Sequence, residues 1–490
     1  MTYKNIVKST VVFGGVKVVE MLVTIIRLKI VAVFLGPEGM GVQSLFQSTL
    51  ASLNQFSSLG IFQSSVRDIS LAYESQNVGQ IGRIVKHVKR WTFFVSLLGG
   101  LLCLIFSKSL SLLVFNNTEH VWSFALLSLA VCFWSLSNGR IAIMQGCRQI
   151  KNLANASLLG AILSLLLVIP LYVKFGQKGI VPALVLFYFS MYVVNYFFQN
   201  KNKLQNSVET IPLKESLKGG QAIVKLGVVL MLGNLLMTLF SLLTNIFIRK
   251  YGNIEDIGLF QAAFTITYGN LIVLMAVLTS DFYPRLSAVY NDNDQVRLLV
   301  NQQSEFLLLV IAPVTILLII VAPLLVSVMY SKEFAIIVPM LRWMALALLF
   351  RIVWHSLSYV ILAKGDKRTY FIYDALLGNG VNFVLNILAY YFGGLNGLGV
   401  SFVVGAVLMA GLLLCVTNMK YGFKFDKSFI VIFFSILISC MLGCILILYW
   451  ESIYGYLICV CIFFIVSSVS LSILNSRIGL WGILKRKFLF

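Results

Sequence analysis

The sequence predicts an all-α protein that crosses a membrane many times, and three observations support this prediction. Of the 490 residues, 59% are hydrophobic and only 11% are charged, whereas a soluble domain carries about 25% charged residues. Apolar runs of about 20 residues, the length of a helix that crosses a bilayer, recur along the whole chain. Basic residues gather in alternate connections between these runs, which is typical of polytopic membrane proteins. Lys17 and Glu20 interrupt the first run, so we do not expect a cleavable signal peptide.

The apolar runs predict about fourteen transmembrane helices. In chain order they lie near 9–35, 40–66, 91–115, 121–145, 153–174, 180–199, 223–249, 257–284, 304–330, 335–363, 370–392, 395–419, 428–450 and 453–475. Most lysines and arginines follow the even-numbered helices, as in the connections 83–90, 201–218 and 420–427. Cytoplasmic loops carry this excess, so we expect both termini to be cytoplasmic and the number of helices to be even.

An internal repeat divides the predicted helices into two halves. "FGQKG" before the sixth helix matches "GGLNG" before the twelfth, and "QGCRQ" after the fourth matches "KGDKR" after the tenth, at offsets of 218 and 219 residues. Six helices return the chain to the same side of the membrane, so the halves should be parallel repeats, as in many transporters. The predicted domains are 1–200, a cytoplasmic linker 201–222, a second six-helix bundle 223–420, and two extra helices with a basic cytoplasmic tail at 421–490.

The first predicted helix carries a narrow polar stripe. Lys17, Glu20, Thr24 and Arg27 are spaced by 3, 4 and 3 residues, which at about 100° per residue places them on one face. Charged side chains are costly against lipid and should face a cavity or a partner. A Lys17–Glu20 ion pair with a snorkelling Arg27 is the alternative. Lys29 projects from a different face of the helix.

Two other helices carry comparable stripes. Asn245 and Arg249 lie on the seventh helix, and Gln43, Gln47 and Asn54 lie on the second. Hydrogen bonds between helices explain any single one of these residues. Because the stripes occur on several helices, two of them related by the repeat, they favour a hydrated central cavity.

The tenth and eleventh helices bring titratable groups to the same depth. Arg351, His355 and Ser358 share a face of the tenth helix, and Asp374 lies in the eleventh. Intramembrane ionisable residues often serve transport. Glu20, Asp374 and His355 are therefore the candidates for coupling transport to an ion gradient.

The predicted cavity is mainly basic, which indicates the kind of substrate. Arginine and lysine suit phosphate groups, and the amide and hydroxyl groups suit sugars. The net charge of +20 lies in membrane-flanking loops, so we expect no nucleic-acid partner. The eight cysteines and three histidines have no metal-ligand spacing, and no phosphate-binding loop of the G-x-x-x-x-G-K-[ST] type occurs. We therefore expect no cofactor, no metal and no catalysis.

Two stretches resemble a known family. "FLGPEGMGVQSLFQ" and "SSLGIFQSSVRDIS", with the doubled six-helix plan, are similar to the bacterial O-antigen flippases. These form the polysaccharide-transporter branch of the multidrug/oligosaccharidyl-lipid/polysaccharide exporter superfamily. The resemblance implies a V-shaped pair of bundles in the inner membrane, with a cation-lined cavity. It also implies alternating-access movement of undecaprenyl-pyrophosphate-linked oligosaccharide for lipopolysaccharide synthesis, and contact with a polysaccharide polymerase and its chain-length machinery.

Carried onto this chain, the resemblance implies that Lys17, Arg27 and Lys29 meet the pyrophosphate, while Arg249 and Arg351 are assigned only from their positions in the predicted helices. Three alternatives stay open. A lipid II flippase would use a similar cationic cavity, whereas an ion-coupled multidrug exporter of the same fold would need an acidic one. A membrane polymerase would need longer external loops.

Overall fold

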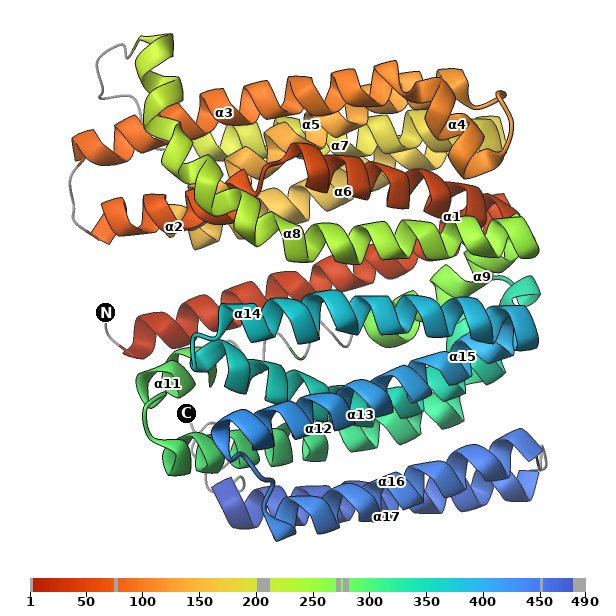
Figure 1. Cartoon of the computed structure of the whole chain (residues 1–490). Coiled ribbons are helices and arrows are strands. Elements are labelled where there is room, and N and C mark those ends of the chain that lie inside the picture. The colour runs from red at the N-terminus through yellow and green to blue at the C-terminus, as the bar shows by residue number, and fades with distance from the viewer. Residues whose placement is uncertain are drawn as a thin grey trace. The chain divides into compact units, whose positions relative to one another are not determined.

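The computed structural model describes residues 3–74, 78–200, 212–269, 275, 282–449 and 453–478, and within these ranges the chain is helical without strands (Figure 1). This confirms the predicted all-α fold. Contacts divide the chain into two units. The first contains Met1–Gly258 and Met329–Ser331, and the second contains Leu259–Val328 and Lys332–Phe490.

The first unit is built from long helices joined by short connections. Its helices are α1 (Tyr3–Ser57), α2 (Ile61–Glu74), α3 (Val78–Ile105), α4 (Ser107–Phe115), α5 (Val121–Gly146), α6 (Ile150–Phe175), the 3₁₀ turn Gly176–Gly179, α7 (Ile180–Asn200) and α8 (Leu213–Tyr251). Helix α9 (Ile254–Phe264) begins in this unit. The inner faces of α3, α5 and α7 pack together, and α1 packs between α6 and α8.

The second unit contains the remaining helices and two π-helical segments. It comprises the π-helix Thr265–Gly269, α11 (Phe282–Ala288), α12 (Asn293–Met329), the 3₁₀ turn Lys332–Ile337, α13 (Val338–Ala363), α14 (Lys367–Thr369), the π-helix Tyr370–Leu377, α15 (Gly378–Tyr421), α16 (Lys427–Tyr449) and α17 (Ile453–Ile478). Helices α16 and α17 run side by side, and α16 packs against α13.

Helix α1 consists of two segments that meet at Gly36. The backbone of Gly36 has φ 63° and ψ −173°, a conformation that glycine adopts readily because it has no Cβ. Pro37 then begins the second segment, where its missing N–H is no loss. Gly394 breaks α15 in the same way, with φ 53°. Each break lies between two predicted helices, 9–35 and 40–66 in α1 and 370–392 and 395–419 in α15. The predicted helix 40–66 is itself divided, because α1 ends at Ser57 and α2 begins at Ile61.

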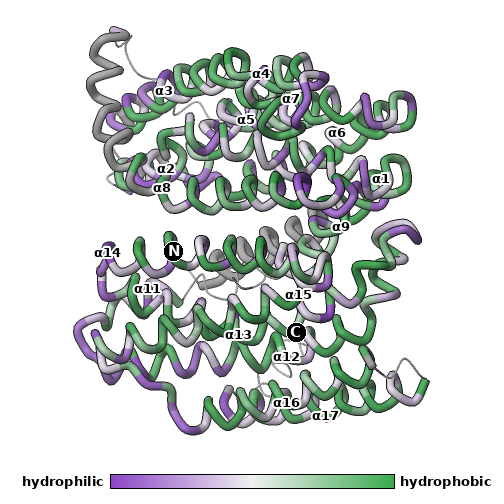
Figure 2. Tube along the Cα trace, turned by 45° about the vertical axis from the view of Figure 1, so that its right-hand side comes forward, coloured by the Kyte–Doolittle hydropathy of each residue, from purple (hydrophilic) through white to green (hydrophobic). Residues whose placement is uncertain are grey.

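The helices have the length and surface that a membrane requires. Nine stretches of the described residues are long and apolar enough to cross a bilayer. The stretch 150–199 contains α6 and α7, and the stretch 367–421 contains α14, a π-helix and α15. Figure 2 shows hydrophobic residues along the helices and hydrophilic ones mainly near their ends. Large apolar side chains face outward, among them Trp122 and Phe392, which are 86% and 82% exposed. The chain is therefore a multi-pass membrane protein.

Helix α8 packs against α1, α2 and α3, and contacts group it with the first unit. The domain division at residue 223 stays a prediction. The ninth helix, expected at 304–330, is longer than predicted, because α12 already begins at Asn293. The first turns of α12 carry polar residues, so the apolar run that predicts this helix begins later than the helix itself.

A buried arginine joins the last two helices to the second unit. Arg342 of α13 is only 1% exposed. Its Nε donates to the backbone oxygen of Ile319 at 3.3 Å, and its Nη2 donates to the Tyr456 hydroxyl at 2.9 Å. Pro323 lies four residues after Ile319 in α12 and has no N–H to bond that oxygen. Arg342 therefore satisfies a carbonyl that proline leaves free, and it links α12, α13 and α17.

Candidate functional site

Arg27 of α1 is a cation supported by aromatic rings. Its guanidinium carbon lies 5.0 Å from the centre of the Phe187 ring, close enough for a cation–π interaction. The phenols of Tyr172 and Tyr188 are its electrostatic neighbours. Among the described side chains, no carboxylate forms an ion pair with Arg27. Its planar N–H groups thus remain suited to an anion such as phosphate.

The aromatic wall beside Arg27 continues across two helices. Tyr188 of α7 is hydrogen-bonded to Gln47 of α1. The Tyr188 ring stacks on Trp134 of α5, with ring centres 4.8 Å apart and planes 18° apart. The predicted site residues Arg27 and Gln47 are therefore brought to the same group of rings.

Two other predicted residues bind neighbouring helices. Asn54 donates to the Ser135 hydroxyl at 2.7 Å, and Asn245 donates to the Ser48 hydroxyl at 3.2 Å. Both asparagines are buried, at 4% and 2% exposure. These contacts match the interhelical alternative that the sequence left open. A role of either residue in binding substrate remains a prediction.

The remaining predicted residues of the first unit lie apart from this wall. Lys29 donates to the backbone oxygen of Tyr330, and the Nε of half-buried Arg249 has no hydrogen-bond partner in the described part of the chain. The buried oxygen of the Gln43 amide likewise lacks a described partner. The side chains of Lys17 and Glu20 lie outside the described residues.

The second unit brings Arg351, His355, Ser358 and Asp374 into one cluster. The Arg351 guanidinium carbon lies 3.8 Å from the centre of the Trp354 ring. The indole N–H of Trp354 and the Ser358 hydroxyl both donate to Asp374 Oδ1, each at 2.6 Å. The buried Nε2 of His355 has no hydrogen-bond partner among the described residues. The shared face predicted from residue spacing thus forms, with Asp374 held against it.

Two π-helical segments shape this cluster. Asp374 lies in the π-helix Tyr370–Leu377, and Tyr268, an electrostatic neighbour of Arg351, lies in the π-helix Thr265–Gly269. Such segments are rare and are frequent at functional sites. Trp354 was missed at the sequence level, because a tryptophan in an apolar helix looks like an ordinary lipid-facing or core residue.

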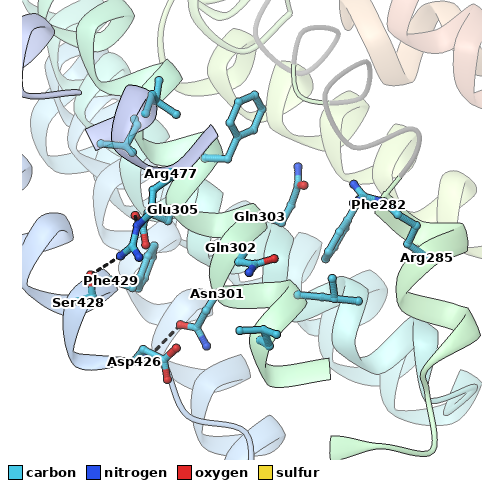
Figure 3. Close-up of a pocket in the computed structure, with 15 residues that line it drawn as sticks. Phe282, Arg285, Asn301, Gln302, Gln303, Glu305, Asp426, Ser428, Phe429 and Arg477 are labelled. Atoms are coloured by element: carbon cyan, nitrogen blue, oxygen red, sulfur yellow. Dashed lines mark hydrogen bonds and ion pairs between the residues drawn. The ribbon is translucent and has the colours of Figure 1, made fainter. Parts of the chain in front are cut away.

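Each unit also contains a cavity. The cavity of the first unit has a volume of about 250 Å³ and includes Asn54 in its lining. The cavity of the second unit, about 440 Å³, contains none of the predicted site residues. Figure 3 shows Arg477 and Glu305 on one side of this second cavity and Arg285 on the other. Arg477 pairs with Glu305 at 3.1 Å, so its charge is already matched.

Comparison with known proteins gives two family matches. Residues 30–339 match the family described as Polysaccharide biosynthesis protein, and residues 262–469 match the family described as Lipid II flippase MurJ. A curated relative, the Lipid III flippase of Escherichia coli (strain K12), is 19% identical over 350 residues, which cover 70% of this chain and 81% of the relative.

Solved structures show the same fold. The structure titled Lipid II flippase MurJ, inward closed conformation, has a TM-score of 0.72 at 16% identity and covers 95% of this chain and 99% of that one. The inward-facing structure of a multidrug resistance MATE family transporter has a TM-score of 0.66 at 17% identity and covers 84% of this chain and 98% of that one. At such identities the likeness concerns the fold.

Proposed function

The chain belongs to the polysaccharide biosynthesis protein family, and from that premise we propose that it is a flippase that moves a lipid-linked oligosaccharide across a membrane. The curated relative that is named a Lipid III flippase supports this proposal. So does the fold shared with a lipid II flippase. A flippase needs no catalytic group, since its substrate changes sides of the membrane without a chemical change.

The observation that carries the proposal is the environment of Arg27. The Arg27 guanidinium carbon lies 5.0 Å from the centre of the Phe187 ring, and no described carboxylate forms an ion pair with it. Such a cation suits a pyrophosphate. A cationic drug would instead require an acidic site. The proposal assigns Lys17, Lys29, Arg249 and Arg351 to further contacts with the phosphates as the substrate moves.

We further propose an undecaprenyl-pyrophosphate-linked unit of the O-antigen type as the substrate, moved by alternating access in a bacterial inner membrane with both termini cytoplasmic. A polysaccharide polymerase and chain-length machinery would receive the unit. Glu20, Asp374 and His355 remain the proposed ion-coupling residues. Trp354 and Ser358 both donate to Asp374 Oδ1.

A lipid II flippase is the second candidate. The match of residues 262–469 to the MurJ family and the likeness to its structure favour it. The two candidates share the polyprenyl pyrophosphate and differ in the glycan, so transport assays with each lipid separate them.

The test uses purified protein in liposomes that contain a fluorescent polyprenyl-pyrophosphate oligosaccharide. We expect the wild type to move the probe between leaflets without altering it, and Arg27→Gln to slow this movement strongly. Arg140→Gln is the matched control, because Arg140 lies 4.7 Å from the Tyr196 ring centre but already donates to Gln199. Equal transport by Arg27→Gln and wild type would refute the assignment of Arg27. A wild type that moves a cationic dye and not the lipid would refute the proposed function.

A further inference from the structure

The cavity of the first unit lies where α1, α2, α3 and α5 meet, and its lining contains no ionisable residue. Four side-chain amides line it, from Asn54, Gln55, Gln63 and Asn138, together with serines and the Trp134 ring. A cavity with this lining has no charge with which to hold an ion. It offers neutral hydrogen-bond donors and acceptors beside two aromatic residues, Phe62 and Trp134.

Some of the hydrogen-bonding capacity of this lining is unused. Asn138 and Gln63 are half-buried and line the cavity, so their amides can be reached from it. The Gln55 Nε2 and the Ser65 hydroxyl are buried, and they lack a described partner. Ser65 is 0% exposed. Unpaired polar groups in such positions are unfavourable unless a water or a ligand bonds to them.

Trp134 connects this cavity to the surroundings of Arg27. Trp134 is among the residues that line the cavity, and its ring stacks on Tyr188, an electrostatic neighbour of Arg27. A molecule with an anionic group at Arg27 and a neutral polar group in the cavity would thus contact two sides of one aromatic wall. A lipid pyrophosphate that carries a sugar has this arrangement of groups.

We propose that this cavity is a subsite for one neutral sugar ring of the lipid-linked substrate, an inference that rests on the proposed flippase function. The sugar hydroxyls bond with the amides of Asn138 and Gln63, and the apolar C–H face of the ring packs on Trp134. At about 250 Å³ the cavity is smaller than the roughly 300–1,000 Å³ of pockets that enclose a whole small molecule. It therefore accepts one ring of the glycan, and the rest extends beyond it.

The test compares two probes in the same liposomes. One is a fluorescent polyprenyl pyrophosphate that carries a single N-acetylhexosamine, and the other is the same lipid without sugar. The double variant Asn138→Ala/Gln63→Ala loses two hydrogen bonds to the sugar, each worth about fivefold in rate or affinity. We expect movement and binding of the sugar-bearing probe to fall on the order of tenfold or more, with the bare lipid unchanged. Asn152→Ala, an amide of α6 outside the cavity, should leave both probes unchanged.

Several outcomes distinguish the subsite from the function on which it rests. If Arg27→Gln slows both probes while the double variant slows neither, the flippase function stands and the subsite is wrong. Equal slowing of both probes by the double variant, with normal thermal unfolding, also overturns the subsite, because the cavity would then serve transport in general. Trp134→Phe, which keeps a ring, should lose less than Trp134→Leu for the sugar-bearing probe alone. A wild type that moves and binds neither probe overturns both proposals.

Discussion

Replacing Arg342 by methionine tests how the last two helices are attached to the second unit. Methionine keeps most of the apolar volume but removes the donors to the Ile319 oxygen and the Tyr456 hydroxyl, now 3.3 and 2.9 Å from Arg342. An orphaned buried polar group costs about 1–3 kcal/mol. This applies to the Ile319 oxygen, and the half-buried Tyr456 hydroxyl adds less, so we predict a loss of about 1–4 kcal/mol. The opposing effect is the desolvation of the buried guanidinium, which methionine removes.

A second substitution makes the prediction sharper. Pro323→Ala restores an N–H that can bond to the Ile319 oxygen. In that background Arg342→Met should leave only the half-buried Tyr456 hydroxyl without its partner and cost about 1 kcal/mol or less. The two substitutions should therefore couple by about 1–3 kcal/mol in a double-mutant cycle.

Cysteine labelling provides the assay. Cys444 of α16 and Cys459 of α17 are 1% and 0% exposed, whereas Cys415 and Cys461 are exposed. Loosening α16 and α17 should raise maleimide labelling of the two buried thiols, read by mass spectrometry, with the exposed ones as internal references. If Arg342→Met leaves this labelling unchanged or lower, desolvation dominates and the attachment is not carried by these two bonds.

Three further predictions concern packing and coupling. Gly258→Val should destabilise the first unit, because even a Cβ at this position would lie 1.9 Å from the carbonyl oxygen of Pro37 in α1. A Cβ at Gly393 meets nothing within 4 Å, so Gly393→Ala is the control. Thermal unfolding of the two variants measures the difference in stability. Asp374→Asn keeps an acceptor for its two donors, so it should change the gradient dependence of transport more than stability, and unaltered gradient dependence would remove Asp374 from the coupling residues. Asn245→Ala removes the bond to Ser48 and should cost about 1 kcal/mol of stability; a tenfold loss of transport at normal stability would indicate that Asn245 also binds substrate.

The sequence predicted the helices well because hydrophobic length and turn chemistry are local properties. The run of apolar residues and the Gly36–Pro37 pair were enough to place the break in α1. Residue spacing on one helix also predicted that Arg351 and Ser358 share a face. What those side chains touch on other helices is not a local property.

The partners of buried polar residues could not be predicted for that reason. Arg342 looks like any arginine in an apolar helix until Pro323, in the preceding helix, is seen to leave a carbonyl free for it. The π-helix around Asp374 likewise has no signal in the hydrophobic period. The packing of α8 against α1 depends on contacts between distant segments, which no local pattern in the sequence indicates.

The most direct test of the central claim is the movement of a lipid-linked oligosaccharide by liposomes that contain Arg27→Gln. We predict that the wild type and Arg140→Gln exchange the fluorescent lipid between leaflets, and that Arg27→Gln exchanges it at least on the order of tenfold more slowly, as expected for the loss of a charge-assisted bond to phosphate. Equal rates for Arg27→Gln and wild type, with both proteins folded, would contradict the account.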